Sequence, residues 1–410
     1  MTHVSQDPEA IVVGAGPAGC AVAALLAREG VRVLLMERSS APPPKVCGEY
    51  LSPGCLPILD RLGALTPLRD AGARPLRGMA IHTSGGRTLW ATYATGQNAD
   101  PPTPPHALSV PRTVLDPLLL DLAVKHGADF EPGFQASDVL WRDGRVAGIQ
   151  GRHRGAWASR VAPIVIGADG RHSVVARRIG ATTRHAWLDR MACVGYLAGV
   201  RRESEVGEVF LGRDRYGILN PVADDLTNVG LVISRREVPR DANPRRLFSH
   251  IAESLPGLSD RLRSARPTAP VRCLGPLAYR ATRLAAPGAL LVGDAAGFLD
   301  PFTGEGIYAA LRSAELAAHC ILTTRKRGDA PVSDFQEYAN AWLREFTPKW
   351  RLATLLQHAV RRPRIAECLV AYLSPRPTLT AHLMAAFGDL LPGAHLRPLP
   401  LLFRLLVSRK

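Results

Sequence analysis

Residues 10–37, AIVVGAGPAGCAVAALLAREGVRVLLME, place the strongest constraint on how this chain folds. An apolar run of strand length is broken by GAGPAG, continues with helical spacing, and returns to a second apolar run. Gly14, Gly16 and Gly19 permit a tight turn and close approach to a diphosphate, which the N-terminus of the following helix attracts. Glu37 ends the second strand where a carboxylate is expected to hold ribose hydroxyls. The segment predicts dinucleotide binding and leaves NAD or FAD open.

Length and cysteine usage bound the class of protein. A chain of 410 residues is long enough for two domains or one large discontinuous assembly. The start, MTHVSQDPEA, has neither a basic patch nor an apolar segment, so we expect no secretory signal and a cytoplasmic protein. The 7 cysteines are scattered and never form CxxC, which predicts reduced thiols and no metal site.

The net charge of +15 invites a nucleic-acid interpretation, but the arginines are spread out and no basic motif interleaved with aromatic residues accompanies them. We therefore expect no nucleic-acid partner. The basic excess is strongest between Arg344 and Lys410, where HAVRRPRIAECLVAYL and LLFRLLVSRK combine apolar residues with arginine. This pattern fits peripheral contact with an anionic membrane. It also fits a helical lid packed on the dinucleotide-binding domain with its arginines in water, which base rates favour.

The remaining pattern predicts elements along the chain. We expect a short helix from about Leu56, a surface connection at 98–105, and an amphipathic helix that ends at Gly127. Asp143-Gly144 suits the turn of a hairpin, and the alternating stretches between Ala192 and Ser234 predict an antiparallel sheet. After the stretch 290–311 the chain is expected to be mostly helical.

Two later stretches resolve the choice of dinucleotide. VIGADGRHSVVARRIG (165–180) and LLVGDAAGFLDPFTGEGIYAAL (290–311) each begin as a buried strand and pass into a loop with an Asp beside glycine. With GAGPAG they resemble FAD-dependent oxidoreductases of the aromatic hydroxylase (group A flavin monooxygenase) and geranylgeranyl reductase superfamily, over residues 10 to about 325. Three ordered motifs at such separations are highly specific for FAD.

The resemblance implies an α/β fold. It consists of a Rossmann-type FAD-binding domain (glutathione reductase-like, aromatic hydroxylase subtype), an antiparallel β-sheet substrate domain and a helical C-terminal tail. The expected bounds are 1–75, 105–182 and 288–332 for the FAD-binding domain, 76–104 and 183–287 for the substrate domain, and 333–410 for the helical region.

The resemblance also implies the residues that contact FAD. Asp294 is expected at the ribityl chain, the loop Pro301–Gly306 at the isoalloxazine ring, and Arg112 near the cofactor. The helix beginning near Gly304 would direct its dipole at the pyrimidine edge and favour the reduced anion. The expected cofactor-binding residues are Gly14, Gly16, Ala18, Gly19, Glu37, Arg38, Cys47, Gly48, Arg112, Asp169, Gly170, Gly293, Asp294, Pro301, Gly304, Gly306 and Ile307.

KVCGEYLSP (45–53) resembles the K-x-C-G segment of geranylgeranyl reductases, in which the cysteine lies on the substrate side of the flavin. Gly297, where aromatic hydroxylases usually carry His, favours the same branch. The reductases' Y-x-W-x-F-P segment is replaced by YGILNP at 216–221. The W-x-W-x-I-P string of flavin halogenases is absent, so halogenation is set aside.

The catalytic candidates are Cys47, Glu49 and Pro301. Cys47 is either a reactive thiol whose thiolate Lys45 stabilises or a small packing residue. Glu49 is either a pocket acid or a loop carboxylate, and the sequence does not separate the two.

The family implies an enzyme that takes electrons from NADH or NADPH. We expect a monooxygenase that hydroxylates a hydrophobic or polyketide-like small molecule. The alternative is a reductase of carbon–carbon double bonds in a lipophilic substrate, and a non-catalytic flavoprotein is the least favoured hypothesis.

Overall fold

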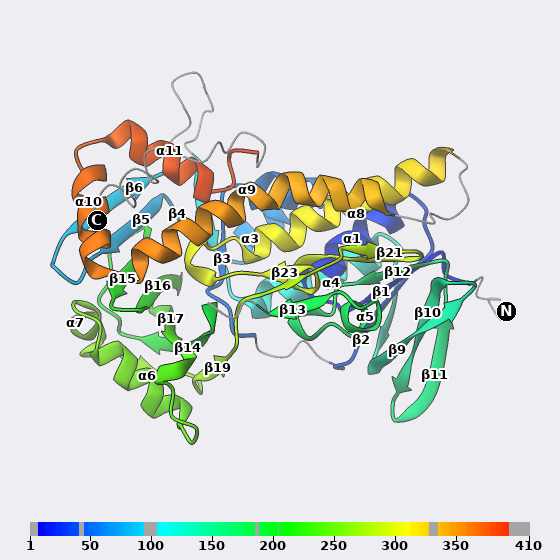
Figure 1. Ribbon diagram of the computed structural model, residues 1–410, viewed down its shortest axis with the longest axis horizontal. Coiled ribbons are helices and arrows are strands. Elements are labelled where there is room, and N and C mark those ends of the chain that lie inside the picture. The colour runs from blue at the N-terminus through cyan, green and yellow to red at the C-terminus, as the bar shows by residue number, and fades with distance from the viewer. Residues whose placement is uncertain are drawn as a thin grey trace.

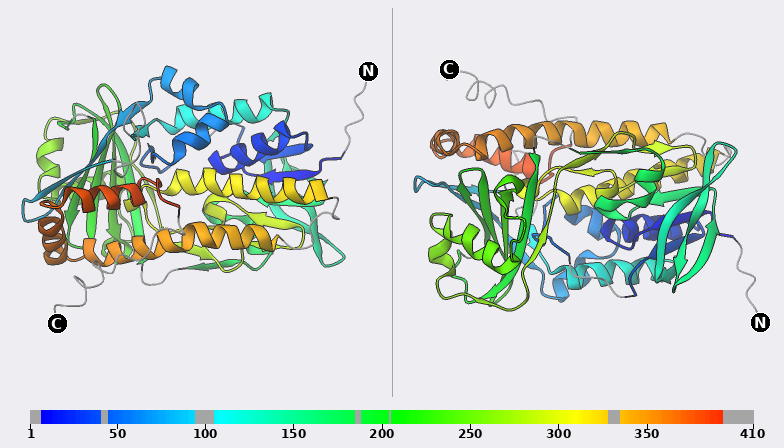
Figure 2. Two further views of the ribbon diagram at one scale, coloured as in Figure 1. Left: turned by 90° about the horizontal axis from the view of Figure 1, so that it is seen from above. Right: turned by 60° about the horizontal axis from the view of Figure 1, so that its bottom comes forward.

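The computed structural model describes residues 7–40, 45–93, 105–184, 188–203, 205–327 and 335–392. Two sheets dominate these residues, one toward each end of the long axis, and two long helices, α8 and α9, run along that axis above them (Figure 1). Figure 2 shows α8 and α9 side by side from above.

The first sheet contains the dinucleotide-binding segment. Its described strands lie in the order β21 (Ala285–Ala286), β22 (Ala289–Leu291), β12 (Ile164–Gly167), β1 (Ala10–Val13), β2 (Val33–Glu37) and β8 (Asp129–Pro132). All neighbours are parallel except β21 with β22. The central strands are buried along their whole length. Continuous apolar runs form such strands because a parallel sheet is covered on both faces.

The second sheet is mostly antiparallel, as predicted for residues 192–234. Its order is β18 (Arg266–Pro267), β14 (Arg190–Ala198), β17 (Leu226–Ser234), β16 (Arg215–Ala223), β15 (Val206–Gly212), β5 (Gly78–His82) and β6 (Thr88–Thr92), with β19 (Arg272–Leu274) also paired to β14. The pairing of β15 with β5 is parallel. It joins a segment before residue 100 to strands after residue 190, which no local pattern indicates.

Three smaller sheets complete the β structure. They are β9 (Phe134–Arg142), β10 (Arg145–His153) and β11 (Ala156–Val161); β13 (Thr182–Arg184), β20 (Tyr279–Ala281) and β23 (Gly297–Phe298); and β3 (Tyr50–Leu51), β7 (Ala107–Ser109) and β4 (Arg74–Leu76). Asp143 and Gly144 both have positive φ at the β9–β10 turn, so the predicted hairpin is confirmed.

The helices are α1 (Pro17–Arg28), α2 (Cys55–Arg61), α3 (Leu65–Asp70), α4 (Arg112–Lys125), α5 (Val174–Arg178), α6 (Pro244–Glu253), α7 (Leu258–Leu262), α8 (Gly306–Arg327), α9 (Gln336–Val360), α10 (Pro363–Leu373) and α11 (Pro377–Phe387). The helices predicted near Leu56 and before Gly127 are thus confirmed, as is the helical character after residue 311. The predicted connection at 98–105 falls mainly outside the described residues. None of the described helices is long and apolar enough to cross a bilayer.

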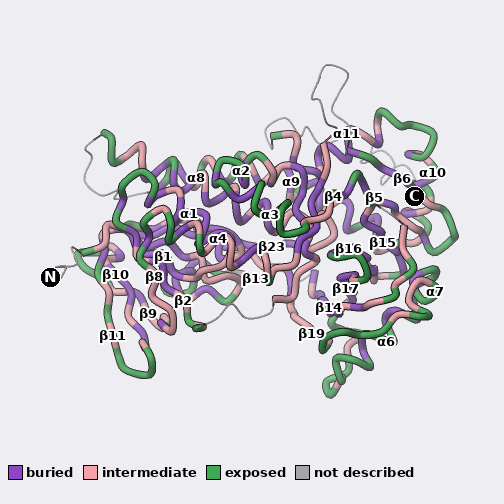
Figure 3. Tube along the Cα trace, turned by 180° about the vertical axis from the view of Figure 1, so that it is seen from behind, coloured by how far each residue is buried: buried purple, intermediate pink, exposed green. Residues whose placement is uncertain are grey.

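The main core lies between the first sheet and its helices, where α1 packs against α4 and α8. Figure 3 shows this buried band and a second one within the antiparallel sheet. Of the two alternatives for the C-terminal region, the lid agrees with part of the packing: α9 packs against α8, while α10 and α11 contact β6 of the second sheet. LLFRLLVSRK lies outside the described residues.

The prediction that all cysteines are reduced is wrong for two of them. Cys193 on β14 and Cys273 on β19 are register partners in neighbouring strands and form a disulfide with a Cα–Cα distance of 4.1 Å. Their separation of 80 residues hides the pairing from the sequence. Cys20, Cys47, Cys55 and Cys320 form no disulfide.

Candidate active site

One cavity of about 980 Å³ runs from the glycine-rich turn of the first sheet to the second sheet and the C-terminal helices. That volume is at the upper end for small-molecule sites. The predicted site residues that line it are Gly14, Gly16, Ala18, Glu37, Arg38, Cys47, Gly48, Glu49, Arg112, Asp169, Gly170, Asp294, Pro301, Gly304, Gly306 and Ile307. Three distant motifs therefore meet around one space.

Gly19 and Gly293 are the predicted site residues that do not line the cavity. A Cβ on Gly19 would lie 1.8 Å from the carbonyl oxygen of Gly14, so Gly19 lets α1 pack against the turn. Gly293 has φ +58° and donates its N–H to Ser313 Oγ at 2.8 Å. Both glycines shape the wall from behind it.

The turn at the first sheet is suited to a diphosphate. Gly14 has φ +103°, and its carbonyl lies against α1. Nothing lies within 4 Å of the position that a Cβ on Gly16 would take, so the backbone there faces open space at the uncapped start of α1. Glu37 accepts the N–H of Ala15 at 3.0 Å and of Ser39 at 3.1 Å, which fixes its carboxylate at the mouth of the turn.

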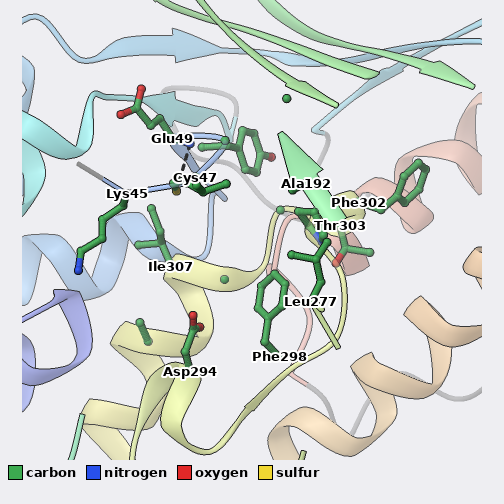
Figure 4. Close-up of a pocket in the computed structure, with 18 of the residues that line it drawn as sticks. Lys45, Cys47, Glu49, Ala192, Leu277, Asp294, Phe298, Phe302, Thr303 and Ile307 are labelled. Atoms are coloured by element: carbon green, nitrogen blue, oxygen red, sulfur yellow. Dashed lines mark hydrogen bonds between the residues drawn. The ribbon is translucent and has the colours of Figure 1, made fainter. Parts of the chain in front are cut away.

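Two carboxylates face the middle of the cavity. Asp169 accepts the N–H of Val174 with Oδ2 at 2.6 Å, whereas its buried Oδ1 has no partner among the described residues. Burial raises the pKa of Asp169 and of Asp294. In Figure 4 the Asp294 carboxylate points toward Ile307. A buried acceptor without a donor is expected where a ligand hydroxyl binds.

These features fit FAD. Gly14 and Gly16 would hold the diphosphate, Glu37 the adenosine ribose, and Asp169 and Asp294 the remaining hydroxyls. The open backbone at Gly16 and the unpartnered Asp169 oxygen are the observations that support this assignment.

The loop Pro301–Gly306 closes the next part of the wall. Pro301 begins a short 3-10 turn, and Asp300 accepts the N–H of Phe302 at 3.0 Å. The same carboxylate accepts the hydroxyl of Tyr216 and the side-chain amide of Gln357 at 2.8 Å. A Cβ on Gly304 would lie 2.6 Å from the Tyr50 ring. The loop is thus fixed by β16 and α9, and sequence reasoning missed Asp300, Tyr216 and Gln357.

Cys47 lies across the cavity from this loop. Burial is the main cause that raises the pKa of its thiol, with Arg112 acting in the opposite direction. We expected that Lys45 could stabilise a Cys47 thiolate. The structure does not support this role, because the Lys45 amine points away from Cys47 (Figure 4). The geometry keeps Cys47 a neutral thiol at pH 7.

Glu49 lines the cavity, and neighbouring groups of the protein hold its carboxylate. It is 1% exposed, and its Oε1 accepts the backbone N–H of Arg112 at 2.7 Å and the Tyr196 hydroxyl at 2.5 Å. Burial raises the pKa of Glu49 against these bonds. The side chain of Arg112 forms a salt bridge with Asp116 one helical turn further on, so this buried cation is neutralised within α4.

A buried charge cluster lies behind the Pro301–Gly306 loop. Lys349 of α9 is fully buried and contacts Asp389 at 2.6 Å and Glu345 at 3.3 Å. Ser52 donates to the other oxygen of Asp389 at 2.7 Å. Burial, followed by the charge of Asp389, raises the pKa of Glu305 to about 8. The cluster ties α9 and the chain after α11 to the start of α2.

The far part of the cavity is apolar. Its walls come from the second sheet, from α9, α10 and α11, from β23 and from the segment before β20. They include Val194, Val209, Leu211, Ile218, Val232, Leu277, Phe298, Leu356, Val360, Leu369, Val370, Leu373, Leu383, Met384 and Phe387. Figure 4 shows Leu277, Phe298 and Phe302 on the side opposite Lys45. This region matches a hydrophobic molecule.

Known proteins resemble this chain over most of its length. The family model for an FAD binding domain matches residues 7–343. Menaquinone reductase of Mycolicibacterium smegmatis is 30% identical over 382 residues, which are 85% of this chain and 84% of that one. A digeranylgeranylglycerophospholipid reductase of Methanothrix thermoacetophila is 29% identical over 344 residues, 82% of each chain.

Among solved structures, a flavin-dependent brominase superposes with a TM-score of 0.84 at 19% identity over 98% of both chains, which shows the shared fold. The motifs, the cavity and the match over residues 7–343 lead to one conclusion. The chain belongs to the FAD binding domain family and is an FAD-dependent oxidoreductase.

Proposed function

We propose that this enzyme uses NADH or NADPH to reduce a carbon–carbon double bond in a long lipophilic substrate of the prenyl type. The observation that carries the proposal is the apolar wall that α10 and α11 complete around the far part of the cavity. Such a wall binds hydrocarbon through burial of apolar area and offers few partners to a polar ring. The reductases named above are similar over 85% and 82% of this chain.

Gly297 supports the same branch. Its φ is +148°, and a Cβ there would lie 2.6 Å from the ring of Trp350 on α9. Trp350 therefore occupies the space that a larger residue at position 297 would need. Gly297 and Trp350 of α9 are therefore complementary in size.

Bound FAD would supply hydride chemistry, receiving two electrons from the nicotinamide and passing them to the substrate. The apolar walls would hold the double bond in place and exclude water. As hydride adds to one alkene carbon, the Cys47 Sγ–H would donate its proton to the other. The resulting thiolate would regain a proton from solvent, so NAD(P)H and one proton are consumed for each bond saturated. Burial, which keeps the thiol neutral, supports this role.

Product mass distinguishes this proposal from hydroxylation. The FAD-loaded enzyme is incubated with NADH or NADPH and with menaquinone or geranylgeraniol, under argon and under air. Reduction predicts a gain of two hydrogens in both atmospheres. A gain of one oxygen atom that requires air would replace the proposal with monooxygenation. Cys47→Ala is expected to keep flavin reduction by the nicotinamide and to slow substrate reduction by about 100-fold.

Hydroxylation, which the family resemblance led us to expect, is the second candidate. Its support is the likeness in fold to flavin-dependent halogenases, including one that is 26% identical with a TM-score of 0.74. The same product-mass experiment decides between the two.

A lipophilic substrate makes peripheral membrane contact part of the proposal. The arginines at the α9–α10 junction, Arg361, Arg362 and Arg364, lie beside the helices that wall the apolar region. Sedimentation with anionic vesicles should be greater for the intact chain than for a chain ending at Ala394. Equal sedimentation would exclude an anchor in the last residues.

A further inference from the structure

The loop that carries Cys47 is held from the second sheet by two side-chain amides. Asn228 on β17 donates to the Cys47 carbonyl at 2.8 Å. Asn220 on β16 donates to the Gly48 carbonyl at 2.7 Å and to the Glu49 carbonyl at 3.1 Å. Three successive backbone carbonyls of the loop therefore accept hydrogen bonds from side chains of β16 and β17, and the Glu49 carbonyl also accepts the backbone N–H of Val110 at 3.1 Å.

Each amide has one chemically permitted orientation. Carbonyl oxygens accept only, so the nitrogen of each amide must face the loop. Asn220 and Asn228 are register partners and are 2% and 1% exposed. Their Oδ1 atoms are buried and have no partner among the described residues. Burying an unpaired acceptor costs free energy. The favourable contribution of each asparagine therefore comes from the hydrogen bonds that its side-chain nitrogen donates.

The loop needs such support because its backbone is strained. Glu49 has φ +55°, a left-handed conformation that a non-glycine residue adopts only where its surroundings impose it. Asn228 also reaches Glu49 Oε2 at 3.4 Å, and the Glu49 N–H points to Cys47 Sγ at 3.3 Å. The position of the sulfur is thus linked directly to the residue that the amides hold.

We propose that Asn220 and Asn228 are positioning residues, an amide clamp through which the substrate-facing sheet fixes the Cys47 thiol over the cavity. The inference rests on the proposed function, because it assigns the clamp to the proton-donating step. Strands β16 and β17 also contribute Ile218 and Val232 to the cavity wall. The clamp therefore sets the distance between the thiol and a molecule lying on that wall.

The test uses Asn228→Ala and Asn228→Asp in the FAD-loaded full chain. The second variant keeps the size of the side chain and places an acceptor opposite the Cys47 carbonyl and the Glu49 carboxylate. The probe is iodoacetamide, and alkylation of Cys47 is followed by peptide mass spectrometry. Cys368, which is exposed, is the internal reference. Asn340→Ala on α9 is the matched control, since it removes an amide far from the loop.

We expect Cys47 to be alkylated roughly tenfold faster in both Asn228 variants, while Cys368 is labelled at an unchanged rate. With a reducible substrate, kcat should fall about 10- to 100-fold with little change in KM, because the thiol is misplaced and the apolar wall is intact. Glu49→Gln added to Asn228→Asp should restore part of the protection by removing the charge repulsion.

Unchanged alkylation of Cys47 in folded, yellow Asn228 variants would overturn the clamp. So would a parallel rise in Cys368 labelling, which would indicate general loosening. If the native enzyme reduces no alkene, the proposed function fails, and the alkylation rates still report on the clamp. If Asn228→Ala does not fold, Asn220→Asp replaces it with the same expected acceleration.

Discussion

The two halves of the cavity are built from different parts of the protein chain. Around the FAD-binding half, the wall is largely backbone at the ends of parallel strands, and its specificity comes from glycines and a few carboxylates in short motifs. Around the substrate half, the wall is made of side chains from antiparallel strands and from helices at the other end of the sequence. A hydrogen bond between Ser52 and Asp389, which helps to hold this half together, joins residues 337 positions apart in the chain. A cofactor site can be encoded locally, whereas this substrate site depends on long-range packing.

The largest expected effect tests the local half. Gly19→Ala places a Cβ 1.8 Å from the Gly14 carbonyl oxygen, a clash between two backbone segments. We expect loss of the yellow holoprotein or at least a 100-fold weaker affinity for FAD. Gly16→Ala is the matched variant, because a Cβ there meets nothing within 4 Å. It should fold and should affect only FAD binding, measured by flavin fluorescence titration. Equal behaviour of the two variants would contradict the distinction between shaping and contacting glycines.

The next effect tests the buried ion pair between Lys349 and Asp389, which helps to hold the substrate half together. Lys349→Met leaves the buried Asp389 without its cation, and removal of one partner of a buried pair costs about 3–5 kcal/mol. The free energy of unfolding should fall by that amount in urea titrations. Asp389→Asn in the same background should recover part of the loss. Additive losses in the double variant would show that the two side chains do not act as a pair.

A pH-dependent effect is expected at Glu305, where the two halves meet. Its pKa is about 8, compared with an ordinary value of 4.5, because of burial and the neighbouring Asp389, with Lys349 opposing them. Between pH 4.5 and pH 8, the folded chain thus binds a proton that the unfolded chain does not bind. This stability is fully present below about pH 4.5 and is lost as the pH rises through 8.

Glu305→Gln has no proton to lose. Its melting temperature should equal that of the native chain near pH 5 and exceed it by a few degrees at pH 9. Thermal unfolding at the two pH values checks this prediction. A difference in melting temperature between the variant and the native chain that is the same at both pH values would show that Glu305 does not titrate in this range.

The smallest effect concerns selectivity in the substrate half. Ile218→Trp would place a larger side chain in the apolar wall of the cavity. FAD affinity should be unchanged, and KM for a long prenyl substrate should rise about tenfold relative to a short one. Steady-state kinetics with geraniol and geranylgeraniol provide the comparison. An equal change in KM for both substrates would show that Ile218 does not contribute to selectivity for the length of the prenyl chain.

The sequence by itself determined the fold class, the cofactor and most of the predicted residues that line one end of the cavity. Those properties depend on short motifs in which backbone conformation is set by neighbours within a few positions, as at Gly14–Gly19 and Asp294–Gly306. It also identified Cys47 and Glu49, but it could not tell a reactive group from a loop carboxylate.

Only the tertiary structure decided how those side chains are used. The Asn220–Asn228 clamp, the Lys349–Asp389 pair and the Cys193–Cys273 disulfide join segments that are not adjacent in the chain. The same holds for burial, which sets whether Cys47 is a thiol or a thiolate. Such contacts depend on strand register and helix packing across the whole molecule, and no local pattern of residues specifies them.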